Sequence, residues 1–174
     1  NTLLEHRLLM AAPCPRPSPA LFLDRDGVLI EDNHYLSDPD QVVLAQVLEL
    51  FRGAKKQQLP VVLITNQYGI ERGHFDWQVY ERVTNRLLEL LGSIAAPAAI
   101  YANGYGPNAP SDSWRKSSPE MLLAAARDLN LDLNQSLLVG DRLSDLQAGG
   151  KAGLPWLGHV HSGHGSKELS AIKH

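Results

Sequence analysis

The chain has 174 residues, of which 44% are hydrophobic and 20% charged, and its formal net charge is −3. These values are typical of one ordinary globular domain with a substantial core and do not indicate a disordered chain. The weak negative charge gives no reason to bind nucleic acid, and no stretch approaches the roughly 20 apolar residues of a membrane span. The single cysteine, Cys14, excludes an intramolecular disulfide framework and fits a reducing compartment. We therefore expect a cytoplasmic monomer with no membrane or nucleic-acid partner.

The first 19 residues differ in pattern from the rest of the chain. Residues 1–10 mix charged with apolar residues and lack the apolar core of a signal peptide. Prolines at alternate positions from Pro13 to Pro19 favour an extended segment. We expect an extended leader over residues 1–19 and a single domain over residues 20–174. One interpretation takes Met10 as the natural start, which would make residues 1–9 an upstream extension.

An apolar run over residues 20–23 leads into two aspartates, Asp24 and Asp26. Such a run predicts a buried parallel strand, and ligands collect at the carboxyl ends of these strands. Two carboxylates this close repel each other unless a cation neutralises them, and Mg²⁺ is commonly held by carboxylates together with substrate phosphate oxygens. The motif predicts a magnesium site in which one carboxylate attacks. A plain β-turn explains Asp26-Gly27 equally well when the motif is taken alone.

Two further segments carry polar groups that suit phosphate. After a polar loop at 30–39 and a helix expected over 42–57, a second strand over 60–67 ends near Thr65 and leads into a glycine-bearing turn. A hydroxyl with exposed backbone N–H groups can bind an anion, although a strand that simply ends in a polar turn is the simpler interpretation in isolation. The loop at 30–39 is equally open to substrate contact or to plain solvation.

The second half of the chain repeats the alternation of helix and strand. A helix is expected over 76–92, a strand over 98–102, and a Gly-, Asn- and Pro-rich loop over 103–114. Arg115 and Lys116 follow, just before a helix that begins at Ser118-Pro119-Glu120 and runs to residue 129. A helix N-terminus and two cations both attract an anion, although an exposed basic pair is usually only solvated surface.

The last elements complete the set. A strand over 136–141 ends in Asp141, a helix runs from Asp145 to residue 152, and a final strand covers 155–160. The pattern predicts an α/β fold with a doubly wound, Rossmann-like parallel sheet. Its strand ends and one helix start would supply a nucleophile, an acid/base, a hydroxyl, a lysine and metal-binding carboxylates, which together suit phosphoryl transfer.

Four motifs in this order resemble those of the haloacid dehalogenase-like (HAD) phosphatase superfamily. They are Asp24-Arg-Asp-Gly-Val, Ile64-Thr-Asn-Gln-Tyr-Gly-Ile, Arg115-Lys116 and Gly140-Asp-Arg-Leu-Ser-Asp. The chain is most similar to the group of D-glycero-D-manno-heptose 1,7-bisphosphate phosphatases and histidinol-phosphatases, over about residues 20–166. The resemblance implies a HAD fold and a Mg²⁺-dependent phosphatase that removes the 7-phosphate of that heptose through an aspartyl-phosphate. The intervals between Asp26, Thr65 and Lys116 each hold only one helix and one strand, so we expect no cap domain.

The resemblance also assigns roles to individual residues. Asp24 would attack phosphorus, and Asp26 would protonate the leaving alkoxide and then activate water. Thr65 and Lys116 would stabilise the phosphoryl group. The implied Mg²⁺ ligands are Asp24, Asp26 through its carbonyl, Asp141 and Asp145. The implied substrate contacts are Arg25, Asp32, Tyr35, Asn66, Gln67, Arg115 and Arg142.

Departures from the family pattern affect the substrate more than the reaction. The loop from Gly104 to Trp114 has no cysteine or histidine where the close family carries zinc ligands, so we expect no zinc. Histidinol phosphate stays open as the substrate, and a polynucleotide 3′-phosphate is disfavoured by the net charge. The alternatives without phosphatase activity are a receiver-like domain, which would need an aspartate near Asn103, and a domain that only binds phosphate.

Overall fold

The computed structural model describes residues 4–9, 11–26, 47–92 and 96–159. It contains one six-stranded sheet with the strand order β1-β4-β3-β2-β5-β6. The strands are β1 (Glu5–Leu9), β2 (Leu21–Asp24), β3 (Val61–Asn66), β4 (Ala99–Asn103), β5 (Leu137–Gly140) and β6 (Trp156–His159). Strands β2 to β6 pair in parallel, as predicted, whereas β1 pairs antiparallel with β4 at one edge.

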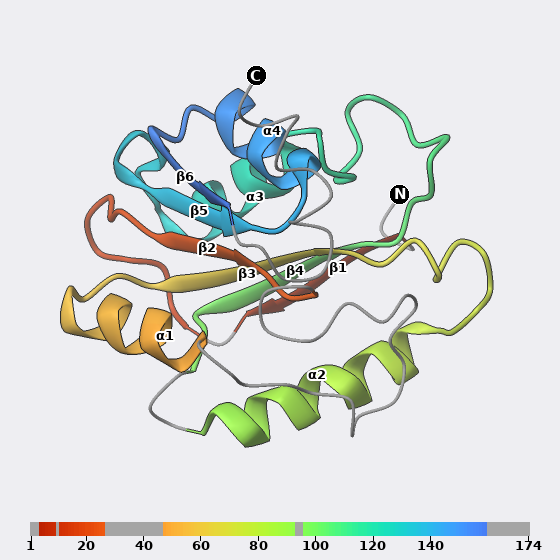
Figure 1. The fold of residues 1–174 in the computed structure, drawn as a ribbon, viewed down its shortest axis with the longest axis horizontal. Coiled ribbons are helices and arrows are strands. Elements are labelled where there is room, and N and C mark those ends of the chain that lie inside the picture. Colours follow the sequence, from red (N-terminus) through yellow and green to blue (C-terminus); the bar gives the residue numbers. More distant parts are fainter. Residues whose placement is uncertain (1–3, 10, 27–46, 93–95, 160–174) are drawn as a thin grey trace.

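Helices cover both faces of the sheet (Figure 1). They are α1 (Val47–Lys56), α2 (Trp77–Leu91), α3 (Glu120–Leu129) and α4 (Leu143–Lys151), and a short 3₁₀ turn spans Leu133–Gln135. Helices α1 and α2 lie on one face, and α3 and α4 lie on the other. This arrangement confirms the predicted doubly wound α/β fold. The first residues of the helix predicted over 42–57 lie outside the described residues.

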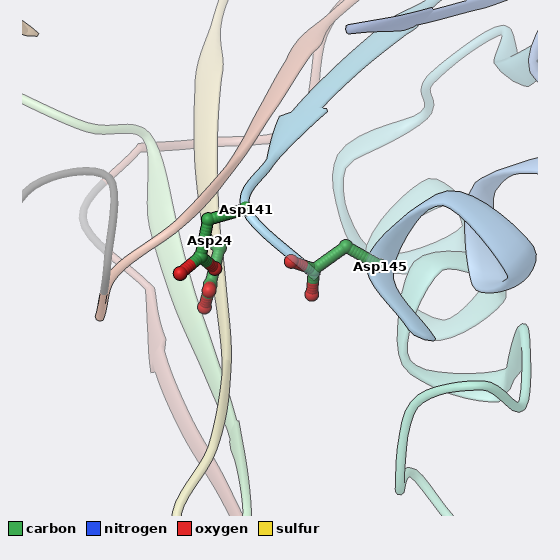
Figure 2. A group of neighbouring side chains, drawn as sticks. All are labelled: Asp24, Asp141 and Asp145. Atoms are coloured by element: carbon green, nitrogen blue, oxygen red, sulfur yellow. The ribbon is translucent and has the colours of Figure 1, made fainter. Parts of the chain in front are cut away.

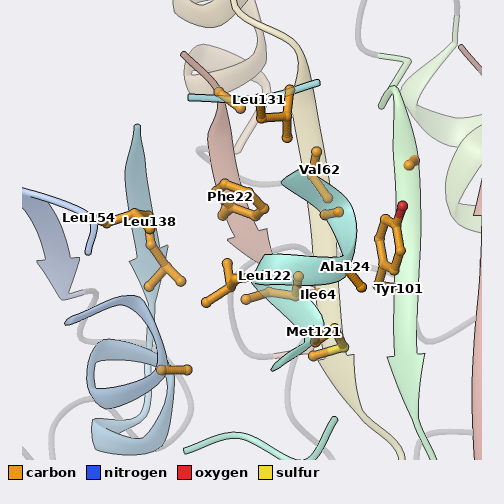
Figure 3. Close-up of a cluster of buried hydrophobic side chains, with 14 of the residues drawn as sticks. Phe22, Val62, Ile64, Tyr101, Met121, Leu122, Ala124, Leu131, Leu138 and Leu154 are labelled. Atoms are coloured by element: carbon orange, nitrogen blue, oxygen red, sulfur yellow. The ribbon is translucent and has the colours of Figure 1, made fainter. Parts of the chain in front are cut away.

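Two hydrophobic cores follow from the alternation of side chains along the strands. Phe22 on β2 faces α3 and α4, while its neighbours Leu21 and Leu23 face α1 and α2. Successive side chains of a strand point to opposite faces, so a strand buried on both sides reads as a continuous apolar run. Figure 3 shows the first core, where Phe22 and Ile64 lie beneath α3. Each such side chain stabilises the fold by about 1.5–3 kcal/mol.

The N-terminal segment differs from the predicted leader. Glu5–Leu9 belongs to the sheet as β1, and Leu4 O accepts a 2.7 Å hydrogen bond from Gly104 N–H. The following proline-rich residues lie against the domain, since Ser18 forms an isolated bridge with Leu131. The mixture of charged and apolar residues over residues 1–10, which argued against a signal peptide, is also the pattern of an edge strand, which is only half covered. The sheet therefore begins before residue 20.

Strand order brings the ends of β2 and β5 together at the middle of the sheet. The chain passes from β2 to β3 and β4 on one side, and then crosses back to place β5 on the other side of β2. Such a reversal creates a crevice at the carboxyl ends of the two strands, where ligands bind in open α/β sheets. Within the described residues, the regular elements between Thr65 and Lys116 are α2 and β4, so this interval holds no cap domain. In the described part of the chain, no helix is long and apolar enough to cross a membrane.

Candidate active site

Three buried carboxylates meet at this crevice. Asp24 ends β2, Asp141 directly follows β5, and Asp145 lies in the first turn of α4. One oxygen from each lies within 4.8 Å of the others. Figure 2 shows the three side chains approaching one another from β2, from the end of β5 and from α4. We call Asp24, Asp141 and Asp145 the aspartate cluster.

Local backbone structure fixes Asp145 in this cluster. Its Oδ2 accepts a 3.2 Å hydrogen bond from Arg142 N–H, which caps the start of α4. Its side chain also packs directly against Gly140, where a Cβ would lie 2.5 Å from the Cβ of Asp145. Real Cβ atoms do not approach so closely. Glycine at the end of β5 therefore leaves the space that Asp145 occupies.

Lys116 joins two members of the cluster. Its Nζ lies 3.1 Å from Oδ1 of Asp24 and 2.5 Å from Oδ1 of Asp145. Burial lowers the pKa of Lys116, but the two carboxylates outweigh this effect and raise it, so the lysine is charged. A buried ammonium held beside the candidate nucleophile can stabilise a phosphoryl group.

Asn66 and Asn103 hold the backbone of Lys116 in place. Asn66 donates to Lys116 O at 3.3 Å and accepts from Lys116 N–H at 3.2 Å. Asn103 at the end of β4 donates to Asn66 Oδ1 at 3.1 Å and to Tyr105 O at 3.2 Å. Asn66 was predicted as a substrate contact. The structure shows that its side chain also contacts Lys116 and Asn103 within the protein. Asn103 was missed, although its place at a strand end is the signal that identified the other residues.

The chemistry of the aspartate cluster suits a divalent cation. Burial raises the pKa of Asp24 well above its usual value, and the nearby charges of Asp145 and Asp141 raise it further, against the effect of Lys116. The positive charge of Lys116 does not balance three carboxylates. A hard divalent cation prefers oxygen ligands and would supply the missing positive charge.

Asp26 and Thr65 lie beside the cluster and are bridged by Gln67. Gln67 Nε2 donates to Oδ2 of Asp26 and to Oγ1 of Thr65, both at 2.7 Å. Thr65 is fully buried, whereas the side chain of Asp26 is 21% exposed. Gln67, predicted as a substrate contact, therefore orients the candidate acid/base and the candidate phosphate-binding hydroxyl.

Arg25 was predicted to contact substrate, but the structure places its side chain beneath the site. It is fully buried, donates to Oδ1 of Asp26 at 2.8 Å and reaches Thr84 on α2 at 3.0 Å. Side chains on a strand alternate between faces, so the residue between two site aspartates points into the layer of α2. The sequence shows that Arg25 lies between Asp24 and Asp26. Its burial was not predicted, because a charged residue in a core layer is an exception to the usual apolar pattern.

A cavity of about 350 Å³ opens above these residues. It is lined by Asp24, Asp26, Asn66, Gln67, Tyr68, Gly69, Phe75, Arg115, Lys116, Arg142, Leu143, Ser144 and Gln147. Burial lowers the pKa of Arg115, whose guanidinium lies 5.7 Å from the centroid of the Tyr68 ring. Tyr68 in a turn and Ser144 and Gln147 on α4 were not predicted as site residues, because single uncharged polar residues carry no distinctive pattern. Asp32 and Tyr35, two predicted substrate contacts, lie outside the described residues.

Proteins of known family are similar to this chain in sequence. The HAD-hydrolase-like family model (Hydrolase_like) matches residues 113–173. A D-glycero-beta-D-manno-heptose-1,7-bisphosphate 7-phosphatase from Mesorhizobium japonicum is 45% identical over 82% of this chain and 70% of its own length. A D-glycero-alpha-D-manno-heptose-1,7-bisphosphate 7-phosphatase from Burkholderia mallei is 38% identical over 78% of this chain and 76% of its own.

Two crystal structures match most of the chain. A HAD-like phosphatase from Mesorhizobium loti superposes with a TM-score of 0.82 and 40% identity, and covers 89% of this chain and 78% of its own. The D,D-heptose 1,7-bisphosphate phosphatase of B. bronchiseptica, solved with magnesium and phosphate, gives a TM-score of 0.79 and 31% identity. It covers 88% of this chain and 86% of its own.

Proposed function

The chain belongs to the HAD-like phosphatases, in the group of D-glycero-D-manno-heptose-1,7-bisphosphate 7-phosphatases, and we propose that it removes the 7-phosphate of that sugar through an aspartyl-phosphate at Asp24. The observation that carries the proposal is the place of Asp24. It ends the central strand, is buried beside Lys116, and forms the aspartate cluster with Asp141 and Asp145. A carboxylate beside a fixed cation and a metal-binding cluster is suited to attack on phosphorus.

The first step transfers the phosphoryl group to the enzyme. A carboxylate oxygen of Asp24 attacks phosphorus in line, and the bond between phosphorus and the sugar oxygen breaks. Asp26, which lines the same cavity, gives its proton to the leaving alkoxide. Asp26 is left as a carboxylate and the sugar leaves as an alcohol.

The second step regenerates the enzyme. Asp26 takes a proton from water as the water oxygen attacks phosphorus, and the bond between phosphorus and the Asp24 oxygen breaks. Inorganic phosphate is released, Asp24 returns as a carboxylate, and Asp26 again holds the proton for the next cycle. Each proton moved in one step is returned in the other.

The charged groups around Asp24 stabilise the transferring phosphoryl group. Lys116 supplies a buried positive charge, and Thr65 supplies a hydroxyl that Gln67 orients. Mg²⁺, which accompanies phosphate in the B. bronchiseptica structure, would be held by Asp24, Asp141 and the carbonyl of Asp26 with Asp145 beside it, and would draw charge from the phosphate oxygens. Arg115 and Arg142 at the cavity would bind the rest of the phosphorylated sugar.

The test is phosphate release from the alpha and beta anomers of heptose 1,7-bisphosphate, with histidinol phosphate and a 3′-phosphorylated oligonucleotide as the rival substrates. Each is assayed with Mg²⁺ and with a chelator, with Asp24→Asn as the control. We expect Mg²⁺-dependent release from one heptose anomer and none from the variant. Preferred turnover of histidinol phosphate or of the oligonucleotide would contradict the assigned substrate. A cytoplasmic location and a monomeric state stay predictions.

A further inference from the structure

We propose that Arg25 and Gln67 are positioning residues that hold the Asp26 carboxylate in line for both of its proton transfers. We call Arg25 and Gln67 the carboxylate clamp. The inference rests on the proposed function, because it concerns how Asp26 serves that reaction. Neither residue needs to touch the substrate for this role.

Each residue of the clamp donates a hydrogen bond to a different oxygen of Asp26. Arg25 Nε donates to Oδ1 at 2.8 Å, and Gln67 Nε2 donates to Oδ2 at 2.7 Å. With its side chain 21% exposed, Asp26 is otherwise free to rotate toward solvent. Two short hydrogen bonds from separate donors fix the plane of the carboxylate, and each oxygen keeps a second lone pair for a reacting proton.

Arg25 is itself held rigidly from the α2 side. Its Nη1 donates to Thr84 Oγ1 at 3.0 Å, and its guanidinium lies 4.9 Å from the centroid of the Tyr80 ring. All three side chains are 1% exposed or less. Burying a guanidinium costs free energy, and hydrophobic residues of similar volume are often at least as stabilising in such places. A buried arginine at position 25, with its Nε bonded to Asp26, therefore serves the placement of that carboxylate better than it serves stability.

Gln67 is fixed by residues at the ends of β3 and β4. Its backbone N–H donates to Asn103 O at 2.6 Å, and its Nε2 also donates to Thr65 Oγ1. Helix α2, strand β3 and strand β4 thus all contribute to the orientation of the Asp26 carboxylate. Support from rigid elements is the arrangement that keeps a reacting group within a fraction of an ångström of its working position.

Leaving groups of different basicity separate this role from a merely structural one. The ratio kcat/KM reports the steps up to transfer of the phosphoryl group to Asp24. A sugar alkoxide needs a proton as it leaves, whereas 4-nitrophenolate leaves without one. A misplaced Asp26 therefore lowers kcat/KM for the sugar phosphate and leaves kcat/KM for 4-nitrophenyl phosphate unchanged. Damage to Asp24, Lys116 or the metal site lowers both.

The experiment measures kcat/KM for heptose bisphosphate and for 4-nitrophenyl phosphate, with Mg²⁺, in wild type, Arg25→Gln and Thr84→Val. Thr84→Val keeps the volume of a side chain outside the cavity and removes the acceptor for Arg25, so it remains informative if Arg25→Gln folds poorly. Arg52→Gln on α1, which changes an exposed arginine that pairs with Glu49, is the matched control.

For Arg25→Gln we expect kcat/KM on heptose bisphosphate to fall at least about 10-fold more than on 4-nitrophenyl phosphate, which is part of the roughly 100- to 10,000-fold that general acid catalysis contributes. Thr84→Val should lower kcat/KM on heptose bisphosphate more than on 4-nitrophenyl phosphate, but by a smaller factor than Arg25→Gln. Arg52→Gln should leave the two values of kcat/KM in the wild-type proportion. Equal losses on both substrates, or no loss on either, would overturn the clamp. If the wild-type enzyme prefers another alkyl phosphate, the assigned heptose substrate is wrong. Comparing that ester with 4-nitrophenyl phosphate would then still test whether the clamp positions Asp26.

Discussion

The guanidinium of Arg7 lies 4.6 Å from the centroid of the Trp114 ring. This contact joins the edge strand β1 to the residue that directly precedes Arg115 and Lys116. Arg7 also pairs with Asp128 on α3 at 2.9 Å, and Asp128 accepts a 2.7 Å hydrogen bond from Tyr101. The N-terminal strand therefore supports the loop that delivers the lysine of the site.

Replacing Arg7 should weaken the fold modestly. Its side chain is 40% exposed, so solvent screens the ion pair, and most of the loss comes from the ring contact. We expect Arg7→Ala to lower the free energy of unfolding by about 1 kcal/mol in urea denaturation. Arg52→Ala, which removes the exposed pair with Glu49 on α1, should cost less. An equal cost for the two variants would argue against the role of the Trp114 contact.

A methyl group at position 140 should displace Asp145. Gly140→Ala places a Cβ 2.5 Å from the Cβ of Asp145, so the carboxylate must move away from Lys116. We expect kcat to fall about 100-fold, because small misplacements of reacting groups have effects of this size. Gly53→Ala is the matched control, since a Cβ there meets nothing within 4 Å. Gly140→Ala with wild-type kcat would show that the position of Asp145 is not critical.

Mg²⁺ should stabilise the folded chain through the aspartate cluster. Ligand that binds only the folded state at about 100 times its Kd raises the free energy of unfolding by about 2.7 kcal/mol. Urea denaturation with Mg²⁺ and with EDTA measures this difference, and Asp141→Asn should remove most of it. Asp76→Asn, which changes a helix-capping aspartate outside the cluster, should keep the full response. A response of Asp141→Asn equal to that of wild type would place the metal elsewhere.

Alkaline pH should weaken the fold through Tyr80. Burial raises the pKa of Tyr80 to about 12, although the nearby charge of Arg25 acts in the opposite direction. The unfolded tyrosine loses its proton near pH 10, so the stability tied to the neutral form is complete below pH 10 and is lost as the pH rises through 12. Two pKa units correspond to about 3 kcal/mol. The unfolding free energy of Tyr80→Phe should therefore fall less than that of wild type between pH 10 and 12, and parallel curves would contradict the assignment.

Sequence predicted the strands and helices well because their apolar periods were clear. The runs at 20–23 and 60–67 predicted β2 and β3 within a residue or two, and the alternation with helices gave the doubly wound sheet. The expected meeting of Asp24 and Asp141 followed from the rule that parallel strand ends share one edge. β1 was missed because an edge strand with one covered face carries few apolar residues.

Side-chain partners were harder to predict than positions. Motif spacing gives the order of Arg25 and Gln67 along the chain, but it does not show that both donate to Asp26. That arrangement depends on the face to which each strand residue points and on what α2 presents beneath it. The role of Asn103 likewise depends on the register between β3 and β4, where it lies opposite Asn66.

The position of β2 between β3 and β5 has a consequence for how the protein forms. During synthesis the central strand emerges early, but its neighbour β5 emerges only after α3. Contacts between such distant segments slow folding, because a long loop must close before they contribute. The nascent chain therefore carries Asp24, the proposed nucleophile, long before Asp141 and Asp145 exist beside it. Phosphatase activity should therefore first appear after α4 has been synthesised. The site is completed late in folding.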